Sequence, residues 1–381
     1  MKMFDLKVGM TKIKRILVTG SDGFIGKNLV FRLQERSEFR VLHFVRSDSI
    51  EMLKKLVLSA DIIVHLAGEN RPEDIVSFAL VNIELTKALC QILSECGLKI
   101  PIIYASTTQV VLESAYGKSK LAGEKLIGDL VHEKNNPAII YRLPSIFGKW
   151  CKPNYNSVVA TFCYNISRNL PIKIDNPSLV LKLAYIDDLI DELLDQLELV
   201  KPGLHWGEIK NVYSVSLESL ANQIILFKNS RFSLVSERVG TDFLRALYST
   251  YISYLPSDSF VYDLPSYHDE RGIFVEMLKT KDSGQFSFFT VQKNSIRGSH
   301  YHHTKTEKFL IVKGKVCMCF RHLITGETSE IIVSSEKFQV VESIPGWAHN
   351  IHNIGNSEAI IILWANEIFN REKPDCISCE V

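Results

Sequence analysis

Four residues in the C-terminal third of the sequence could together bind one metal ion. His300 and His302 are two positions apart, so on a β-strand both imidazoles would point to the same face. Glu307 follows after a short interval, and His349 comes just after a proline-glycine turn. Imidazole and carboxylate ligands suit zinc, iron and nickel, and such a set can leave a coordination position open for a substrate. We therefore expect a divalent-metal site in a small β-barrel, with Zn2+ as the expected ion and Fe2+ or Ni2+ as alternatives.

The distribution of histidines favours this metal site over scattered surface histidines. Six of the eleven histidines fall between positions 300 and 352. By strand alternation, His303 and His352 should point away from His302 and His349, so we leave them out of the ligand set. The alternative is a group of hydrogen-bonded core histidines that bind no metal.

A second group of residues could exchange a proton with a carbonyl. The segment Tyr116-Gly-Lys-Ser-Lys120 lies in a helical pattern, and a spacing of four puts the phenol and the ammonium group on one helical face. Lys120 can favour the phenolate and so help Tyr116 to give or take a proton at a carbonyl group that is being reduced. The alternative is an ordinary pair on a helix surface.

A glycine-rich turn earlier in the chain indicates a bound dinucleotide. The strand expected at 15–19 leads into Gly20-Ser-Asp-Gly23-Phe-Ile-Gly26 and then into a helical pattern at 27–35. Such glycines let the backbone turn tightly and approach a pyrophosphate at the helix N-terminus. The next strand ends at Arg46, where an NAD-selective fold would place an acidic residue, and arginine suits a 2′-phosphate. We therefore expect NADPH, with a solvent-exposed arginine as the alternative reading of Arg46.

The order of the elements predicts two kinds of fold in one chain. Strands and helices alternate in the N-terminal part, which predicts an α/β Rossmann-like, doubly wound parallel sheet. From Asp269 the chain is dense in short β-type runs, which predicts an all-β jelly-roll domain. Turn-rich segments near 255–268 suggest the boundary, so we expect domains at 1–255 and 256–381.

Composition excludes several classes of function. With 381 residues and a formal net charge of +1, no global field favours nucleic acid or an anionic membrane surface. The apolar run Ala359–Ala365 is too short to cross a bilayer, and residues 1–15 lack the apolar centre of a secretory signal. We therefore expect a cytoplasmic protein with reduced cysteines, in which Cys376 and Cys379 form an incidental CxxC.

The N-terminal motifs together resemble an extended short-chain dehydrogenase/reductase. The segments that carry the resemblance are Thr19–Gly26, His65–Gly68, Asn82, Tyr116 with Lys120, and Arg142–Gly148. The resemblance implies a third catalytic hydroxyl at the end of the strand before the tyrosine. Ser106, Thr107 and Thr108 all offer one, and we favour Thr107.

The same resemblance implies further contacts. Asn82 would support the active site, and residues of about 150–205 would form a substrate lobe in which Asn156 contacts the nucleotide. The residues that it implies for the cofactor are Gly20, Gly23, Phe24, Ile25, Gly26, Arg46, Leu66, Ala67, Lys120 and Pro144.

The C-terminal motifs resemble the cupin family. His300, His302, Glu307 and Gly314 match its first motif without a gap, whereas the second motif is met only in part, because Pro345 is followed directly by glycine.

Asp269–Glu276 and Arg297–Tyr301 are similar to the sugar-nucleotide epimerase branch of cupins, which implies that Arg271 and Arg297 bind substrate. In metal-free members of that branch, the histidine that matches His300 belongs to the base machinery, so His300 is either base or ligand.

The segment Leu247–Pro256 joins the two parts, and the chain ends in Glu380-Val381. With these segments, and apart from the short N-terminal extension, the whole chain resembles the CapF-type family of bifunctional enzymes of bacterial capsule and O-antigen synthesis. The family implies C3 epimerisation of a UDP-2-acetamido-4-keto-6-deoxy-hexose in the cupin, followed by NADPH-dependent C4 reduction to UDP-2-acetamido-2,6-dideoxy-L-talose. We expect a homodimer through the cupin domain and a UDP-activated amino sugar as substrate. The alternatives are a reductase with a non-catalytic cupin for binding and dimerisation, and an Fe(II)-dependent cupin dioxygenase.

Overall fold

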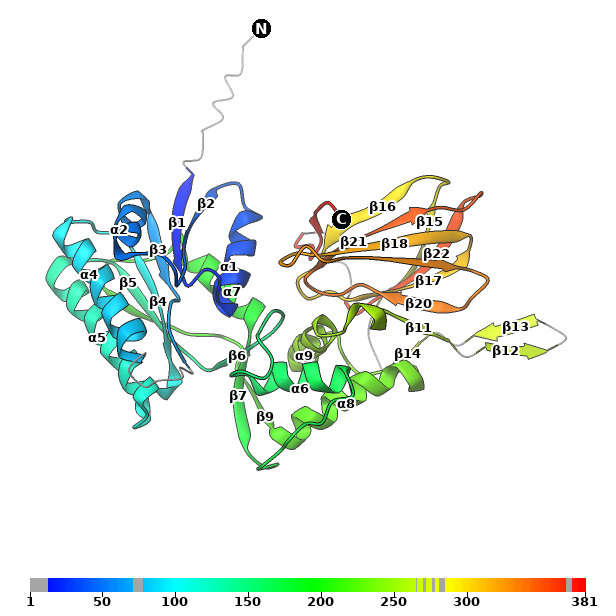
Figure 1. Cartoon of the computed structure of the whole chain (residues 1–381), viewed down its shortest axis with the longest axis horizontal. Helices are drawn as coiled ribbons and strands as arrows, with labels where there is room; N and C mark the ends of the chain where they lie inside the picture. The colour runs from blue at the N-terminus through cyan, green and yellow to red at the C-terminus, as the bar shows by residue number, and fades with distance from the viewer. Residues whose placement is uncertain are drawn as a thin grey trace, which may run out of the picture. The chain divides into compact units, whose positions relative to one another are not determined.

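The computed structural model describes residues 13–70, 78–264, 266–269, 272–275, 278–280, 285–367 and 372–381. Its contacts divide the chain into two compact units (Figure 1). Unit 1 consists of Met1–Pro144 and Asp188–Val212, and unit 2 of Ser145–Asp187 and Tyr213–Val381. The domain boundary expected at residues 255 and 256 stays a prediction, because these units are defined by contacts and not by independent folding.

A six-stranded sheet forms the centre of unit 1, in the order β2-β1-β3-β4-β5-β8. All five neighbouring pairs are parallel. The strands are β1 (Lys14–Thr19), β2 (Phe39–Phe44), β3 (Ile62–His65), β4 (Ile102–Thr107), β5 (Ala138–Leu143) and β8 (Leu204–Gly207). The chain leaves β1 first towards β2 and later towards β3, so the order reverses between β1 and β3. Ligands of open α/β sheets bind at the carboxyl ends of the strands beside such a reversal.

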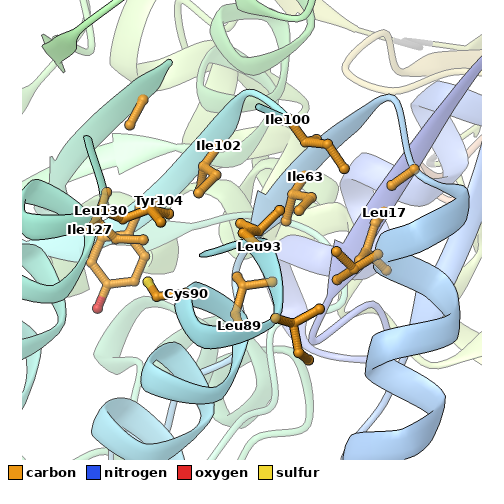
Figure 2. Close-up of a cluster of buried hydrophobic side chains, with 14 of the residues drawn as sticks. Leu17, Ile63, Leu89, Cys90, Leu93, Ile100, Ile102, Tyr104, Ile127 and Leu130 are labelled. Carbon is orange, nitrogen blue, oxygen red and sulfur yellow. The ribbon is translucent and has the colours of Figure 1, made fainter. Parts of the chain in front are cut away.

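Helices cover this sheet because its strands are apolar on both faces. The helices of unit 1 include α1 (Phe24–Gln34), α2 (Ile50–Ser59), α4 (Leu85–Glu95) and α5 (Ala115–Lys134). Leu17, Ile63 and Ile102 of the strands pack with Leu89 and Leu93 of α4 in one buried cluster (Figure 2). Side chains of α2 and α5 complete the same cluster.

Helix α1 is joined instead to α7 (Ile186–Gln196) by an ion pair between Arg32 and Asp191, with a shortest N–O distance of 2.7 Å. Both faces of the sheet are therefore covered (Figure 1).

A small sheet and three helices form one part of unit 2. Strands β6 (Ser145–Phe147), β7 (Val180–Tyr185) and β9 (Tyr213–Ser216) pair in that order. Helices α6 (Val158–Ser167), α8 (Leu217–Ser233) and α9 (Asp242–Ser253) pack together through buried aromatic rings. The Phe227 ring, for example, lies 5.0 Å from that of Tyr248.

Two five-stranded antiparallel sheets form the other part of unit 2, in the orders β11-β20-β17-β22-β15 and β19-β18-β21-β16-β23. Their strands are β11 (Val261–Asp263), β15 (Gln285–Val291), β16 (Ile296–Tyr301), β17 (Glu307–Lys313), β18 (Lys315–His322), β19 (Thr328–Ser334), β20 (Gln339–Glu342), β21 (Trp347–Asn353), β22 (Ala359–Ala365) and β23 (Ile377–Ser378). Met318, Ile361 and Trp364 are almost fully buried, which gives this part a core of its own. A parallel-sheet Rossmann-like part followed by an all-β antiparallel part confirms the predicted fold class.

Two short pairs complete the described strands. Strand β10 (Val235–Ser236) pairs with β14 (Lys279–Thr280), and β12 (Ser266–Asp269) pairs with β13 (Gly272–Val275). Among the helices that the structure describes, none is both long enough and apolar enough to span a bilayer.

Candidate active site and candidate metal centre

The glycine turn lies between β1 and α1, at the carboxyl ends of the strands. Gly20 has a φ of +67°, and a Cβ there would come within 2.9 Å of the Ala67 backbone. A Cβ on Gly26 would come within 2.1 Å of the Gly20 carbonyl oxygen. Gly23 caps α1 without a side chain, and Phe24 and Ile25 form the first turn of the helix. These glycines bring the backbone close enough for a phosphate to reach the helix N-terminus.

Arg46 lies just beyond β2 and forms an ion pair with Glu69. The arginine side chain is 73% exposed, whereas the glutamate side chain is only 9% exposed. Glu69 follows the loop of Leu66 and Ala67 after β3, so its carboxylate fixes Arg46 beside that loop. Sequence reasoning missed Glu69, because nothing in its spacing connects it to Arg46.

Buried hydrogen bonds hold the loop after β3 in place. His65 Nδ1 lies 2.6 Å from Thr19 Oγ1, and His65 Nε2 lies 3.0 Å from Thr86 Oγ1. Burial lowers the pKa of His65 to about 3, with a further contribution from the charge of Lys120, so this imidazole is neutral. The Thr19 hydroxyl also accepts a hydrogen bond from the Ala67 N–H at 3.1 Å. The histidine therefore has a structural role at the cofactor loop.

Asn82 connects this loop to the helix that carries Tyr116. It lies in a π-helical turn, Ala79–Glu84, that leads into α4, and such turns are frequent at functional sites. Its amide accepts a hydrogen bond from the Glu69 N–H at 2.8 Å and donates to Ser119 Oγ at 2.9 Å. The Ser119 hydroxyl in turn donates to the Tyr116 carbonyl at 2.8 Å. This geometry agrees with the supporting role that the resemblance implied for Asn82.

Of the three hydroxyl candidates, Thr107 faces the tyrosine. Burial raises the pKa of Tyr116, and a hydrogen bond from the Thr107 hydroxyl acts in the opposite direction. Ser106 instead donates to Glu124 at 2.5 Å, and the Thr108 hydroxyl lies 3.5 Å from the Leu143 carbonyl oxygen. The geometry therefore agrees with the choice of Thr107, which stays a prediction as a catalytic residue.

Lys120 is buried one helical turn after Tyr116, at 4% exposure. Burial lowers the pKa of Lys120 to about 7, although the charge of Glu124 favours its ammonium form. Its Nζ lies 4.4 Å from the centre of the Tyr104 ring. Sequence reasoning missed Glu124, although a spacing of four residues places it on the same helical face as Lys120. Pro144 directly follows β5, and its contact with the cofactor stays a prediction.

The four predicted metal ligands converge in unit 2. One ligand atom from each of His300, His302, Glu307 and His349 can be chosen so that all four lie within 4.8 Å of one another. His302 Nε2 lies 3.0 Å from Glu307 Oε2, and His349 Nε2 lies 3.4 Å from the same oxygen. His302, Glu307 and His349 are buried, whereas His300 is half-buried. His300 is therefore the one member of this group that is partly accessible to solvent.

The chemistry of this cluster fits a divalent cation. Neither ring nitrogen of His349 has a hydrogen-bond partner among the described residues, although both atoms are buried. Burial lowers the pKa of His349, and burial with the neighbouring imidazoles lowers that of His300 to about 4. For Glu307, burial opposes ionisation, but His302 and His349 outweigh it and hold the pKa well below its usual range. Neutral imidazoles at His300 and His349, beside the ionised carboxylate of Glu307, are in the protonation states that a metal site requires.

The strand geometry differs in one respect from the predicted His-x-His arrangement. Only His300 lies within β16, opposite His349 of β21, whereas His302 follows the end of the strand. The pairing is irregular between Gly298 and His300, where Gly298 and Ser299 both have positive φ values. The imidazoles nevertheless converge, so the bulge and the loop replace simple strand alternation.

The histidines that were excluded from the ligand set lie outside the cluster. The His303 ring points to Asp187, with its Nδ1 3.7 Å from a carboxylate oxygen, and His352 is not part of the ligand group. Asn353 has a structural role, because its amide donates to the Val291 and Ser357 carbonyls at 2.8 and 2.9 Å.

No interaction among the described residues brings the predicted substrate-binding residues together. The Arg297 guanidinium is exposed, lies over the Phe289 ring and donates to the Thr290 carbonyl at 2.8 Å. Asn156 is exposed just before Ser157, the N-cap of α6. Arg271 lies outside the described residues. All three stay predictions.

Fold and site together define a nucleotide-binding enzyme with a Rossmann-like sheet, a glycine turn and a Tyr-Lys pair. Residues 16–209 match the NAD dependent epimerase/dehydratase family, and residues 267–377 match the polysaccharide biosynthesis C-terminal domain. The chain belongs to this epimerase/dehydratase family and, within it, to the CapF-type proteins.

The assignment to the CapF-type proteins rests on relatives that match 96% of this chain. A Pseudomonas aeruginosa protein (strain PA103) named UDP-2-acetamido-2,6-beta-L-arabino-hexul-4-ose reductase is 47% identical over 367 residues, which cover 96% of this chain and 99% of the relative. The crystal structure of the capsular polysaccharide assembling protein CapF from Staphylococcus aureus has a TM-score of 0.65 and 40% identity, and the match covers 96% of this chain and 100% of that one. CapF with the inhibitor 3-isopropenyl-tropolone has a TM-score of 0.61 and 37% identity, with the same coverage.

Proposed function

We propose that this protein is a bifunctional nucleotide-sugar enzyme. It epimerises C3 of a UDP-2-acetamido-4-keto-6-deoxy-hexose at the histidine–glutamate cluster and then reduces the C4 ketone with NADPH at Tyr116. The product is UDP-2-acetamido-2,6-dideoxy-L-talose, on the way to UDP-N-acetyl-L-fucosamine. The name of the Pseudomonas relative supports the reduction of a UDP-linked sugar. The observation that carries the second activity is the convergence of four ligand atoms within 4.8 Å.

The reduction depends on proton transfer by Tyr116. Burial raises the pKa of this phenol, so it is protonated at neutral pH and can give its proton to the oxygen that forms at C4. The Thr107 hydroxyl and the buried Lys120 stabilise the phenolate that remains. The nicotinamide cofactor, when bound, supplies the hydride. Arg46 is the residue that would bind the 2′-phosphate and so select NADPH.

The epimerisation needs a stabilised negative charge beside the C4 ketone. His302, Glu307 and His349, with His300, would hold one Zn2+, which supplies the positive charge that lowers the cost of removing the C3 proton. A tropolone has adjacent oxygens that chelate divalent cations, so the tropolone inhibitor of a relative supports a metal at this site. Two roles are open to the half-buried His300, as ligand or as the base at C3.

Both activities on one chain pair a reversible step with an irreversible one. Epimerisation beside a ketone runs in both directions, whereas reduction removes the ketone and fixes the new stereochemistry. We expect the enzyme to act in the cytoplasm as a homodimer through the cupin domain, and gel filtration with light scattering measures that state.

The purified protein, a UDP-4-keto-6-deoxy-N-acetylhexosamine and NADPH test the proposal. NMR of the product should show inversion at C3 and a hydroxyl at C4, and elemental analysis should show one Zn2+ per chain. Reduction without inversion at C3 would leave only the reductase, with a non-catalytic cupin. Bound iron with oxygen consumption would favour the dioxygenase.

A further inference from the structure

The loop that joins two of the proposed ligands has no regular secondary structure of its own. It lies between the end of β16 at Tyr301 and the start of β17 at Glu307. Every backbone N–H from His303 to Glu307 donates to a side-chain oxygen from elsewhere in the chain. The conformation of this loop is therefore set by the side chains that accept these hydrogen bonds.

Asp375 accepts most of them. Its Oδ1 accepts the His303 N–H at 2.8 Å, and its Oδ2 accepts the N–H groups of Thr304 and Lys305 at 2.7 and 2.8 Å. The Thr304 hydroxyl donates to the same oxygen at 3.0 Å. One carboxylate thus binds three successive backbone N–H groups, and charge-assisted hydrogen bonds of this kind are stronger than neutral ones.

Asp375 also contacts a proposed ligand directly through its backbone. Its carbonyl oxygen lies 2.5 Å from His302 Nδ1 and can only accept, so His302 carries its proton on Nδ1. The other nitrogen, Nε2, then faces Glu307 Oε2 at 3.0 Å, inside the ligand group. A hydrogen bond of this type fixes the tautomer and the ring orientation of a metal-binding histidine.

The segment that carries Asp375 is itself held against the ligand strand. Strand β23 pairs with β16, with Ser378 opposite His300. The Cys379 N–H donates to the Ser299 carbonyl at 2.8 Å, and Arg321 Nε donates to the Glu380 carbonyl at 3.2 Å. These contacts place residues 375–380 beside the whole stretch from Ser299 to Lys305.

We propose that Asp375 is a positioning residue for the proposed metal centre: its carboxylate sets the path of the 303–305 loop, and its backbone carbonyl orients the His302 ring. This inference rests on the proposed metal-dependent function, but it concerns a residue outside the ligand set and outside both motifs. It predicts that neutralising Asp375 weakens metal binding although every ligand is still present.

The test compares Asp375→Asn with the wild-type protein and with Asp263→Asn, a matched control at a side chain that is 67% exposed. Zn2+ affinity is measured by competition with a chelator, and the path of the loop by the 15N NMR amide resonances of residues 303–305 in the metal-free protein. We expect Asp375→Asn to lose about 10–100-fold in affinity, as is typical when groups that support metal ligands are removed. The amide resonances should shift, because an asparagine side chain has one accepting oxygen in place of two. Asp263→Asn should match the wild type in both.

A second pair of variants covers the case in which Asp375→Asn does not fold. Thr304→Val removes one hydrogen bond to Asp375, whereas Thr304→Ser keeps the hydroxyl. A loss of Zn2+ affinity in the valine variant but not in the serine variant supports the inference. Wild-type affinity in a folded Asp375→Asn protein, or equal affinities in the Thr304 pair, overturns it. A wild-type protein that binds no Zn2+ would instead refute the proposed function, and the amide resonances of residues 303–305 would still decide whether Asp375 sets the path of the loop.

Discussion

Replacing Tyr116 with phenylalanine should separate the two proposed activities. Tyr116 lies in unit 1, whereas the four proposed ligands all lie in unit 2. Tyr116→Phe removes the proton donor for C4 but no residue of the metal centre. C4 reduction should stop, and proton exchange at C3 should continue.

The size of the effect follows from the role of the phenol. Burial raises the pKa of Tyr116, so at neutral pH it carries the proton that C4 reduction requires. Positioned acids and bases contribute roughly 10²–10⁴-fold to a rate. At 1.36 kcal/mol for each factor of ten, this is about 3–5 kcal/mol of transition-state stabilisation. Thr107→Val should lower the same rate, because the phenol loses the hydroxyl beside it. Thr108→Val is the matched control, since the Thr108 hydroxyl makes only a 3.5 Å contact with the Leu143 carbonyl.

The assay follows both reactions in one tube. In D2O, NMR measures deuterium incorporation at C3 of the keto sugar, and absorbance measures NADPH oxidation. Tyr116→Phe should incorporate deuterium while oxidising almost no NADPH. His349→Ala should do the opposite, with no exchange but with reduction of a sugar that is supplied already epimerised. If Tyr116→Phe is folded and metal-loaded but abolishes C3 exchange, the C-terminal part is not an independent epimerase, and the binding-module reading becomes the better one.

Further predictions concern the cofactor, the lysine and the metal. Arg46→Asp should lose roughly 10–100-fold of the preference for NADPH over NADH, the range expected for hydrogen bonds to a charged group; equal kcat/KM values for the two cofactors in the wild type would contradict this. Gly26→Ala places a Cβ 2.1 Å from the Gly20 carbonyl, so calorimetry should show weaker NADPH binding and a lower Tm. Gly128→Ala, in the interior of α5 with no neighbour closer than 3.9 Å, should leave NADPH binding unchanged and raise Tm slightly. Burial lowers the pKa of Lys120 to about 7, so its ammonium form is lost as the pH rises through this value; kcat/KM for reduction should fall above it, and Lys120→Arg should move the fall to higher pH. A profile that stays flat from about pH 6 to 9 would argue against this role. Chelation of the metal should stop C3 exchange without affecting reduction of the epimerised sugar, and loss of both activities would show that the metal serves more than the first step.

Local patterns in the sequence predicted the parts of the site that are close in sequence. The glycine turn could be predicted from Gly20, Gly23 and Gly26, because a side chain on Gly23 or Gly26 would come too close to the backbone of Gly20, a few residues earlier. The Tyr116–Lys120 pair could be read from helical spacing, and it lies as expected on α5. The parallel sheet followed from alternating strands and helices, since short crossovers leave few other topologies.

Contacts between distant residues could not be predicted in the same way. Asp375 binds residues about seventy positions away, with no periodicity to mark the pairing. The bulge at Gly298 and Ser299 depends on backbone angles that strand alternation does not encode. The ion pair of Glu69 with Arg46 joins two loops that become neighbours only when β1, β2 and β3 are aligned.

The hydrogen bonds of the 303–307 loop also determine when the proposed metal centre can assemble during synthesis. The acceptors come from Ser343, Asn366 and Asp375, all of which the ribosome adds after the loop itself. A nascent chain that has already exposed all four proposed ligands therefore still lacks the carboxylate that holds the loop between His302 and Glu307. Contacts of high sequence separation form late, because the intervening chain must be closed first. Translation thus delays the native metal geometry until residue 375 has left the ribosomal tunnel, after the parallel sheet of unit 1 has been synthesised in full.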